Sequence, residues 1–253
     1  MRKQAVPLVV SGGMERDDEL VLGEVRLRLL LDRAAWWSEA ETALVADVHV
    51  GKAAHFRRNG IGVPVGVGWE TLARLTRVLR ATRPRRLVVL GDLVHSTANA
   101  EWDEFRRWLD DERAAGPLEE LLLVLGNHDI LGEAAWREAG VRAVREHVEA
   151  GLRFVHAPES APPAGWEGYT CAGHVHPAVR LQGAGRATLR LPCWHVDEAA
   201  RTCVFPAFGA FTGHHAVAPR AGDRIHAVAD SAVVRVPVAG DPGVSRSSRR
   251  RNR

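Results

Sequence analysis

Five short segments of the sequence place metal-binding side chains directly after an apolar run. These segments are Asp47-Val48-His49, Gly91-Asp92, Gly126-Asn127-His128-Asp129, Val155-His156 and Gly173-His174-Val175-His176. A single aspartate or histidine after a strand is most often a turn or capping residue. Five such segments in one chain favour a common site instead, because ligands bind in loops at the carboxyl ends of strands that meet at one rim.

Two of the segments hold ligand-type residues separated by one position, Asp47 with His49 and His174 with His176. Side chains two positions apart in an extended segment face the same way, so each pair is suited to bind one ion. Carboxylate, carboxamide and imidazole ligands without thiolate suit manganese, iron or zinc, and the ligand types do not choose among them. Two such ions about 3.5–4 Å apart clamp a phosphoryl group and activate a water for in-line attack.

The pattern of apolar residues predicts the elements that must position these segments. In the first part of the chain it indicates strands and helices in alternation, and after residue 139 it becomes strand and turn. Expected strands cover 25–31, 42–46, 87–90, 121–125, 152–156, 169–172, 188–191, 202–206 and 225–236, and expected helices cover 69–82, 101–115 and 133–139. We expect a hairpin over 36–41, an irregular loop over 51–68, and a mixed α/β layered fold.

Length and composition place the chain among globular proteins, with 253 residues, 46% apolar and 26% charged. We expect a flexible N-terminal segment over 1–20, a single domain over 21–237 and a flexible arginine-rich tail over 238–253. The apolar runs are far shorter than the ~20 residues of a membrane span, and the start is not typical of a signal peptide. A soluble protein without a membrane partner is expected.

Net charge and cysteine content indicate which partners and which cellular compartment to expect. The last ten residues hold five of the 34 basic residues and no acid, so the rest of the chain has 29 basic against 31 acidic residues. The pI of about 9.1 is therefore largely a property of the tail and does not by itself indicate a nucleic-acid surface. Three unpatterned cysteines exclude a disulfide framework and favour a reducing, cytoplasmic location.

The order of the motifs, D-x-H, G-D, G-N-H-D, a lone His and G-H-x-H, resembles the calcineurin-like metallophosphoesterase superfamily. A narrower resemblance, carried by residues 47–58, 87–96 and 205–213, is to the bacterial ligase-associated DNA damage response endonucleases. It implies a layered α/β sandwich of two mostly mixed β-sheets flanked by helices. It also implies a manganese-dependent phosphodiesterase that acts on DNA in repair, beside a helicase, a nuclease and a DNA ligase.

The same resemblance assigns a role to each motif residue. One metal is implied to be held by Asp47, His49, Asp92 and His176, and the other by Asp92, Asn127, His156 and His174. Asp92 is then the bridging ligand. His128 is implied to contact the scissile phosphate and to protonate the leaving oxygen, with Asp129 orienting its ring. A histidine beside a carboxylate is chemically suited to that role.

Four further residues near the motifs have a functional and a structural interpretation. His95 follows Asp92 by three positions and either orients a metal ligand or lies in a surface loop. Lys52, Arg57 and Arg58 follow the first ligand pair and either contact substrate phosphates or form a solvated basic loop.

Two alternative functions remain beside the DNA phosphodiesterase. A phosphomonoesterase or a cyclic-nucleotide phosphodiesterase would use the same metal centre, so the ligands do not separate these activities. A non-catalytic scaffold module with this fold would show degraded ligands. Every ligand position and His128 carry the expected residue type, which disfavours the scaffold.

Overall fold

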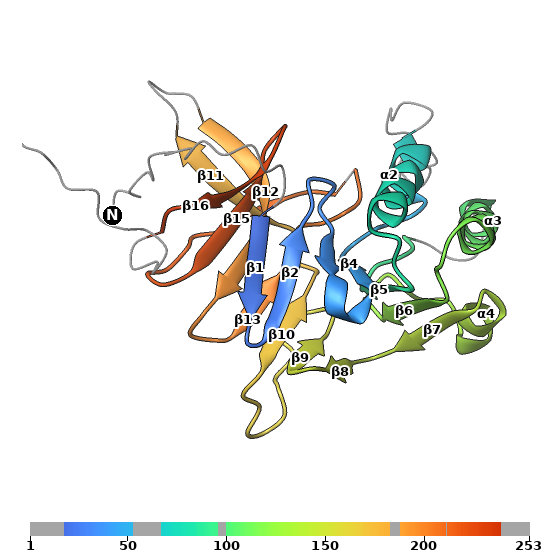
Figure 1. Cartoon of the computed structure of the whole chain (residues 1–253), viewed down its shortest axis with the longest axis horizontal. Coiled ribbons are helices and arrows are strands. Elements are labelled where there is room, and N and C mark those ends of the chain that lie inside the picture. Colours follow the sequence, from blue (N-terminus) through green and yellow to red (C-terminus); the bar gives the residue numbers. More distant parts are fainter. Residues whose placement is uncertain (1–17, 53–66, 96–99, 183–187, 211, 239–253) are drawn as a thin grey trace, which may run out of the picture.

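The computed structural model describes residues 18–52, 67–95, 100–182, 188–210 and 212–238. Two β-sheets pack against each other, and the helices cover the outer face of the first sheet (Figure 1). The fold is thus the layered α/β arrangement of two mixed sheets with flanking helices that the sequence analysis expected.

The first sheet has seven strands in the order β1-β2-β3-β4-β5-β6-β7. The strands are β1 (Asp18–Leu22), β2 (Val25–Leu29), β3 (Ala35–Trp37), β4 (Thr42–Val45), β5 (Arg86–Leu90), β6 (Glu120–Val124) and β7 (Val141–Val144). Strands β1 to β4 pair antiparallel, and β4 to β7 pair parallel. The central parallel strands are apolar on both faces because helices cover one face and the second sheet covers the other.

The helices bury an apolar stripe against the first sheet. They are α2 (Val67–Thr82), α3 (Ala100–Ala115) and α4 (Glu133–Glu138), with a short 3-10 turn over Ser38–Ala40. In α2 the residues Leu72, Leu75 and Val78 recur at helical spacing and are buried, as the periodicity predicts. Phe105 and Leu109 form the corresponding stripe of α3.

The second sheet contains the remaining strands. They are β8 (His147–Glu149), β9 (Leu152–Phe154), β10 (Tyr169–Ala172), β11 (Pro177–Gln182), β12 (Thr188–Asp197), β13 (Thr202–Val204), β14 (His215–Ala216), β15 (Arg224–Val228) and β16 (Val233–Val236). The order is β14-β11-β12-β13-β10-β9-β8, with β15 pairing β12 and β16. Strand β10 runs parallel to both β9 and β13, so the carboxyl ends of these strands lie at one edge.

A core of buried side chains from both sheets joins the two layers. Leu44 and Leu90 of the first sheet pack in one cluster with Phe154, Trp194 and Phe205 of the second. The cluster brings the carboxyl ends of β4 and β5 close to those of β9 and β10. The five ligand-bearing segments follow strands whose ends meet here.

Several elements differ from the sequence expectation. The expected hairpin over 36–41 contains a further strand, β3, because Trp36 pairs with Arg28 and Ala43 on either side. The expected single strand over 225–236 is two strands joined by a turn, in which the Ala229 N–H donates to the Ala232 carbonyl. Strand β1 overlaps the N-terminal segment 1–20. Strands β7, β8, β11 and β14 were not expected, because they are short or form only on pairing with a neighbour.

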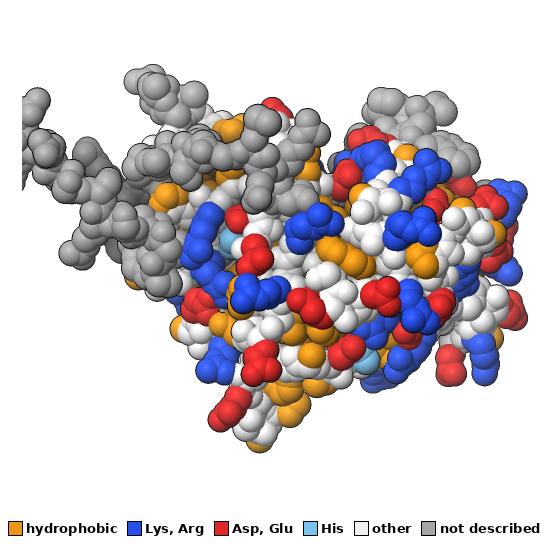
Figure 2. Space-filling view, viewed as in Figure 1, with side chains coloured by type: hydrophobic (Ala, Val, Ile, Leu, Met, Phe, Trp, Pro, Cys, Tyr) orange, Lys and Arg blue, Asp and Glu red, His pale blue; other side chains and the backbone are white. Residues whose placement is uncertain are grey.

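The surface in Figure 2 carries acidic and basic side chains intermixed over the described part of that face. None of the described helices combines the length and the apolar character that a membrane crossing requires.

Candidate metal centre

The first ligand pair lies in the segment after β4, which runs beside the segment after β5. The Asp47 N–H donates to the Gly91 carbonyl at 3.1 Å, and the His49 N–H donates to the Asp92 carbonyl at 2.8 Å. These main-chain bonds continue the parallel pairing of β4 and β5 beyond the strands. They place the side chains of Asp47, His49 and Asp92 at one edge of the sheet.

Five of the seven proposed ligand residues have a left-handed backbone. The φ angles of Asp47, His49, Asp92, His174 and His176 lie between 50° and 68°. A non-glycine residue in this region costs free energy, and such residues cluster where the surrounding structure holds a functional site in place. All five residues lie in the segments that follow β4, β5 and β10, where the two ligand groups form.

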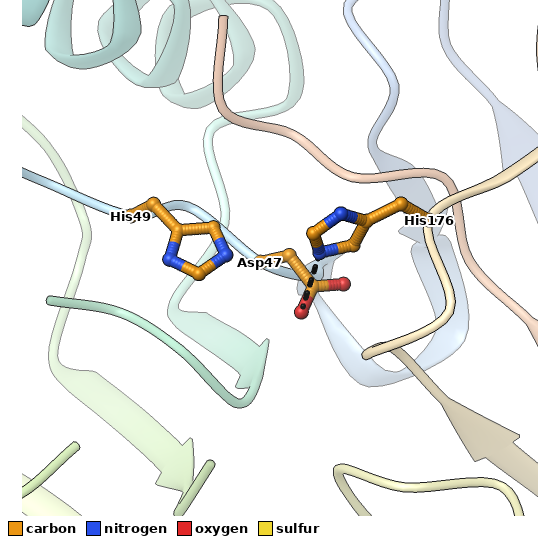
Figure 3. Close-up of side chains that lie close together, drawn as sticks. All are labelled: Asp47, His49 and His176. Carbon is orange, nitrogen blue, oxygen red and sulfur yellow. Dashed lines mark ion pairs between the residues drawn. The ribbon is translucent and has the colours of Figure 1, made fainter. Parts of the chain in front are cut away.

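One group of ligand atoms comes from Asp47, His49 and His176, which lie within 4.8 Å of one another (Figure 3). The Asp47 Oδ1 lies 3.4 Å from the His176 Nε2. A second group comes from Asp92, His156 and His174, again within 4.8 Å. In it the Asp92 Oδ1 lies 3.6 Å from the His156 Nε2.

Asp92 lies between the two groups and contacts both. While its Oδ1 faces His156, its Oδ2 lies 3.6 Å from the Nε2 of His49 in the first group. Asn127 joins the second group, with its Oδ1 3.0 Å from the His156 Nε2. The structure therefore brings the seven proposed ligands together, with Asp92 between the two groups.

The electrostatics of the site fit divalent cations. Asp47 is 0% exposed and Asp92 is 2% exposed, and within the described residues their ion-pair partners are imidazoles. Two buried carboxylates that both lie within 4.0 Å of His156 require compensating positive charge. In addition, the Nε2 atoms of His49 and His176 are buried and have no hydrogen-bond partner among the described residues, which is costly unless an ion binds them.

Main-chain carbonyls orient two of the imidazoles. The Nδ1 of His156 lies 3.2 Å from the Leu90 carbonyl, and the Nδ1 of His176 lies 3.0 Å from the Gly213 carbonyl. A carbonyl acceptor at Nδ1 keeps the proton there and leaves the Nε2 lone pair for a metal. Burial lowers the pKa of His49, and the nearby positive charge of Lys52 lowers it further, which keeps this ligand neutral.

His128 lies at the edge of the two groups. Its main-chain N–H donates to the Asp92 Oδ1 at 2.9 Å, and its ring centre lies 5.3 Å from that of His49. The described hydrogen bonds of Asp129 join its two oxygens to the main-chain N–H groups of Gly126 and Val94. Asp129 therefore fixes the loop that carries His128. Its described hydrogen bonds do not involve the His128 ring. Burial raises the pKa of Asp129 to about 6.

Of the four further residues that the sequence analysis named, His95 and Lys52 are among the described residues. The Nδ1 of His95 lies 3.4 Å from the Nδ1 of His49, and its ring centre lies 4.7 Å from that of His128. Lys52 lies beside the ligand His49, because its main-chain N–H donates to the His49 carbonyl at 3.2 Å, and burial lowers the pKa of its ammonium. Arg57 and Arg58 lie outside the described residues.

Two arginines that the sequence analysis did not single out form hydrogen bonds to the segment that runs beside Asp47. Arg33 donates to the Ala207 carbonyl at 3.2 Å, and Arg74 donates to the Phe208 carbonyl at 2.7 Å. These carbonyls belong to the segment that runs beside Asp47, since the Gly209 N–H donates to the Asp47 carbonyl at 3.0 Å. No sequence motif marks Arg33 or Arg74, because their partners are main-chain atoms far along the chain.

A family model for calcineurin-like phosphoesterases matches residues 41–217, a range that contains every proposed ligand. The chain belongs to this family. It is therefore a metallophosphoesterase, a hydrolase that acts on phosphoester bonds, and the two ligand groups are its candidate dimetal centre.

The solved structures similar to this metallophosphoesterase include a nuclease. The nuclease MPE of Pseudomonas putida is 30% identical, with a TM-score of 0.69, and the match covers 87% of this chain and 100% of that chain. A protein of unknown function from Aquifex aeolicus is 19% identical, with a TM-score of 0.36 over 58% of this chain and 82% of that one. Among curated proteins no sequence matches.

Proposed function

We propose that this metallophosphoesterase is a binuclear phosphodiesterase that cleaves DNA. The observation that carries the proposal is the position of Asp92, whose two oxygens face His49 and His156 in the two separate ligand groups. A shared carboxylate between complete ligand groups suits two ions that clamp one phosphoryl group. The similarity to the Pseudomonas putida nuclease supports a nucleic-acid substrate.

The ligand assignment follows the two groups. Asp47, His49, Asp92 and His176 would hold one ion, and Asp92, Asn127, His156 and His174 would hold the other, manganese being the proposed metal and iron or zinc also suiting the ligands. When bound, two such ions polarise the phosphoryl oxygens and lower the pKa of water to give a hydroxide nucleophile.

The residues around the ligands complete the reaction. A water oxygen would form the new bond to phosphorus as the bond to the leaving oxygen breaks, and His128 would donate a proton to that leaving oxygen. The Asp129 carboxylate, held by two main-chain N–H groups, keeps the His128 loop in place. Lys52, whose main chain is bonded to that of the ligand His49, is proposed to contact a phosphate oxygen of the substrate, and so are Arg57 and Arg58.

The biological setting of the proposal follows from the DNA substrate. A cytoplasmic enzyme of DNA repair, working beside a helicase, a nuclease and a DNA ligase, would need an incision activity of this kind. In this proposal the single domain predicted over 21–237, which strand β1 extends to Asp18 in the structure, carries the whole activity.

The test is hydrolysis of a panel of substrates with manganese: a model diester, a monoester, a cyclic nucleotide and plasmid DNA. Wild type should cleave the model diester and the plasmid. Asn127→Ala and His128→Ala should lose turnover while the circular dichroism spectrum is unchanged. The control His147→Gln alters a histidine on β8, paired with Glu149 at 3.2 Å, and should retain activity.

Other outcomes of this panel would contradict the proposal in distinct ways. An uncut plasmid with rapid turnover of the monoester or the cyclic nucleotide would assign the centre to those substrates. A protein that binds no divalent ion in calorimetry would instead be a scaffold with this fold. Unchanged turnover in His128→Ala would remove His128 from the reaction.

A further inference from the structure

Strand β11 begins directly after the ligand His176 and carries an exposed arginine. It pairs antiparallel with β12, and the register places Arg180 directly opposite Arg190. Both side chains are exposed, whereas Val179, Leu181 and Leu191 on the other face are buried in a core cluster. Because side chains alternate between the faces of a sheet, Arg180 and Arg190 lie on the same outer face.

This arrangement is unfavourable for the sheet taken alone. Like charges directly opposite each other on antiparallel strands destabilise the pair. Within the described residues neither Arg180 nor Arg190 forms an ion pair with a carboxylate, whereas exposed Arg85 and Arg142 pair with Glu119 and Glu120. An anion from outside the protein would compensate the two charges.

The arginine pair lies on strands that lead away from the metal centre. His176 directly precedes Pro177, the first residue of β11, and its carbonyl accepts the main-chain N–H of His215 in β14 at 2.9 Å. Strand β14 pairs with β11 on the side away from β12. The strand that carries Arg180 is therefore fixed to the segment that holds the ligand His176.

We propose that Arg180 and Arg190 form a phosphate-binding surface that holds the sugar-phosphate backbone of a nucleic-acid substrate beyond the scissile bond. This inference rests on the proposed function and specifies how that site binds a polymeric substrate. Planar guanidinium groups bind phosphate oxygens in pairs, and such contacts fix the position of the backbone without reading its sequence.

The distance from the metal centre favours a polymer over a mononucleotide. Arg180 follows His176 by four residues, which in an extended strand is a separation of about 13 Å. A duplex carries a phosphate about every 3.4 Å along each strand, so a flanking phosphate reaches this distance and the phosphate of a single nucleotide does not.

The experiment compares two charge-matched double variants. Arg180→Gln with Arg190→Gln removes the proposed surface. Arg80→Gln with Arg83→Gln removes two exposed arginines at the carboxyl end of α2, at the opposite edge of the first sheet from the ligands. Binding to fluorescent single-stranded and duplex oligonucleotides is measured by anisotropy over a series of salt concentrations, and turnover is measured on a model diester and on DNA.

We expect the Arg180/Arg190 variant to bind DNA about tenfold more weakly at low salt. For each phosphate that the variant no longer neutralises, the log–log slope of affinity against salt should become shallower by about 0.9 on duplex, or about 0.7 on a single strand. KM for DNA should rise, and turnover of the model diester should equal that of wild type. The melting temperature should stay equal or rise, because a like-charge pair has been removed. Arg190→Lys should retain most of the affinity.

Equal DNA affinity and salt slope in the two double variants would overturn the inference while leaving the proposed function in place. A fall in model-diester turnover that parallels the fall in DNA binding would also overturn it, by assigning the arginines a structural role. If wild type hydrolyses no diester and binds no oligonucleotide, the proposed function and this inference both fail.

Discussion

The main-chain N–H of His174 donates to both carboxylate oxygens of Asp47, at 3.1 and 2.9 Å. Asp47 follows β4 of the first sheet and His174 follows β10 of the second, 127 residues later. The bond therefore joins the carboxyl ends of the two sheets at the metal centre. It also fixes the Asp47 carboxylate beside His176, whose Nε2 lies 3.4 Å from the Asp47 Oδ1.

The glycine before Asn127 is required for the position of Asp92. A Cβ at residue 126 would lie 2.2 Å from the Asp92 Oδ1, which is inside van der Waals contact. We expect Gly126→Ala to weaken manganese binding and turnover by about a hundredfold or more. The added methyl group would displace the Asp92 carboxylate, and a misplacement of about 1 Å near the reacting atoms costs a factor of this size. Isothermal titration calorimetry and diester hydrolysis measure these effects.

Gly132 provides the matched control, because a Cβ there meets nothing within 4 Å. Gly132→Ala should match wild type in metal affinity and turnover. Equal behaviour of the two alanine variants would show that the close approach of residue 126 to Asp92 does not determine the geometry of the centre.

Metal should stabilise the folded protein because it compensates two buried carboxylates. At a free manganese concentration about 100 times Kd, linkage predicts an increase of about 2.7 kcal/mol in the free energy of unfolding. Differential scanning calorimetry with manganese and with a chelator measures the shift. A melting temperature independent of manganese would contradict a site in the folded state.

Asp92→Asn should separate the two roles of Asp92. The variant removes a buried charge but keeps an oxygen that can accept the His128 N–H, which Asp92 accepts at 2.9 Å. We expect the metal-free variant to be at least as stable as metal-free wild type, and the stabilisation by manganese to be lost. A large loss of stability in the metal-free variant would instead make Asp92 a structural residue.

Acid should inactivate the enzyme reversibly. Four of the proposed ligands are imidazoles, which bind metal only when neutral, so protons compete with the metal as the pH falls. Burial lowers the pKa of one of them, His49, which therefore stays neutral to lower pH than an exposed histidine does. We expect manganese affinity to fall in acid and to return on neutralisation. Activity at saturating manganese that does not decline in acid would contradict the four-imidazole centre.

The three cysteine thiols should not react in the folded protein. Cys171, Cys193 and Cys203 are free and buried, and burial raises the pKa of each, to about 12 for Cys203. Because the thiolate is the reactive form, a thiol reagent at mildly alkaline pH should label none of them until denaturant is added. Rapid labelling of the native protein would show that this core opens readily.

Some of this architecture could be predicted because it follows from local patterns. The apolar periodicity of α2 and α3 and the continuous apolar runs of β5 and β6 indicate their elements, since burial on a helix or strand face depends on spacing within a few residues. By contrast, β3, β11 and β14 depend on their neighbours. The pairing of Trp36 with Arg28 and Ala43, for example, satisfies main-chain groups that the local sequence does not reveal.

The sequence by itself determined the ligand types, their order and the family to which they point, because D-x-H, G-D, G-N-H-D and G-H-x-H are local motifs. Only the tertiary structure decided how they combine: Asp92 between His49 and His156, Asp129 on the main-chain N–H of Val94, and Arg180 opposite Arg190. Each of these relationships joins residues that are distant in sequence or depends on strand register. Contacts between distant residues and the register of strands depend on the packing of the whole chain and not on any local preference.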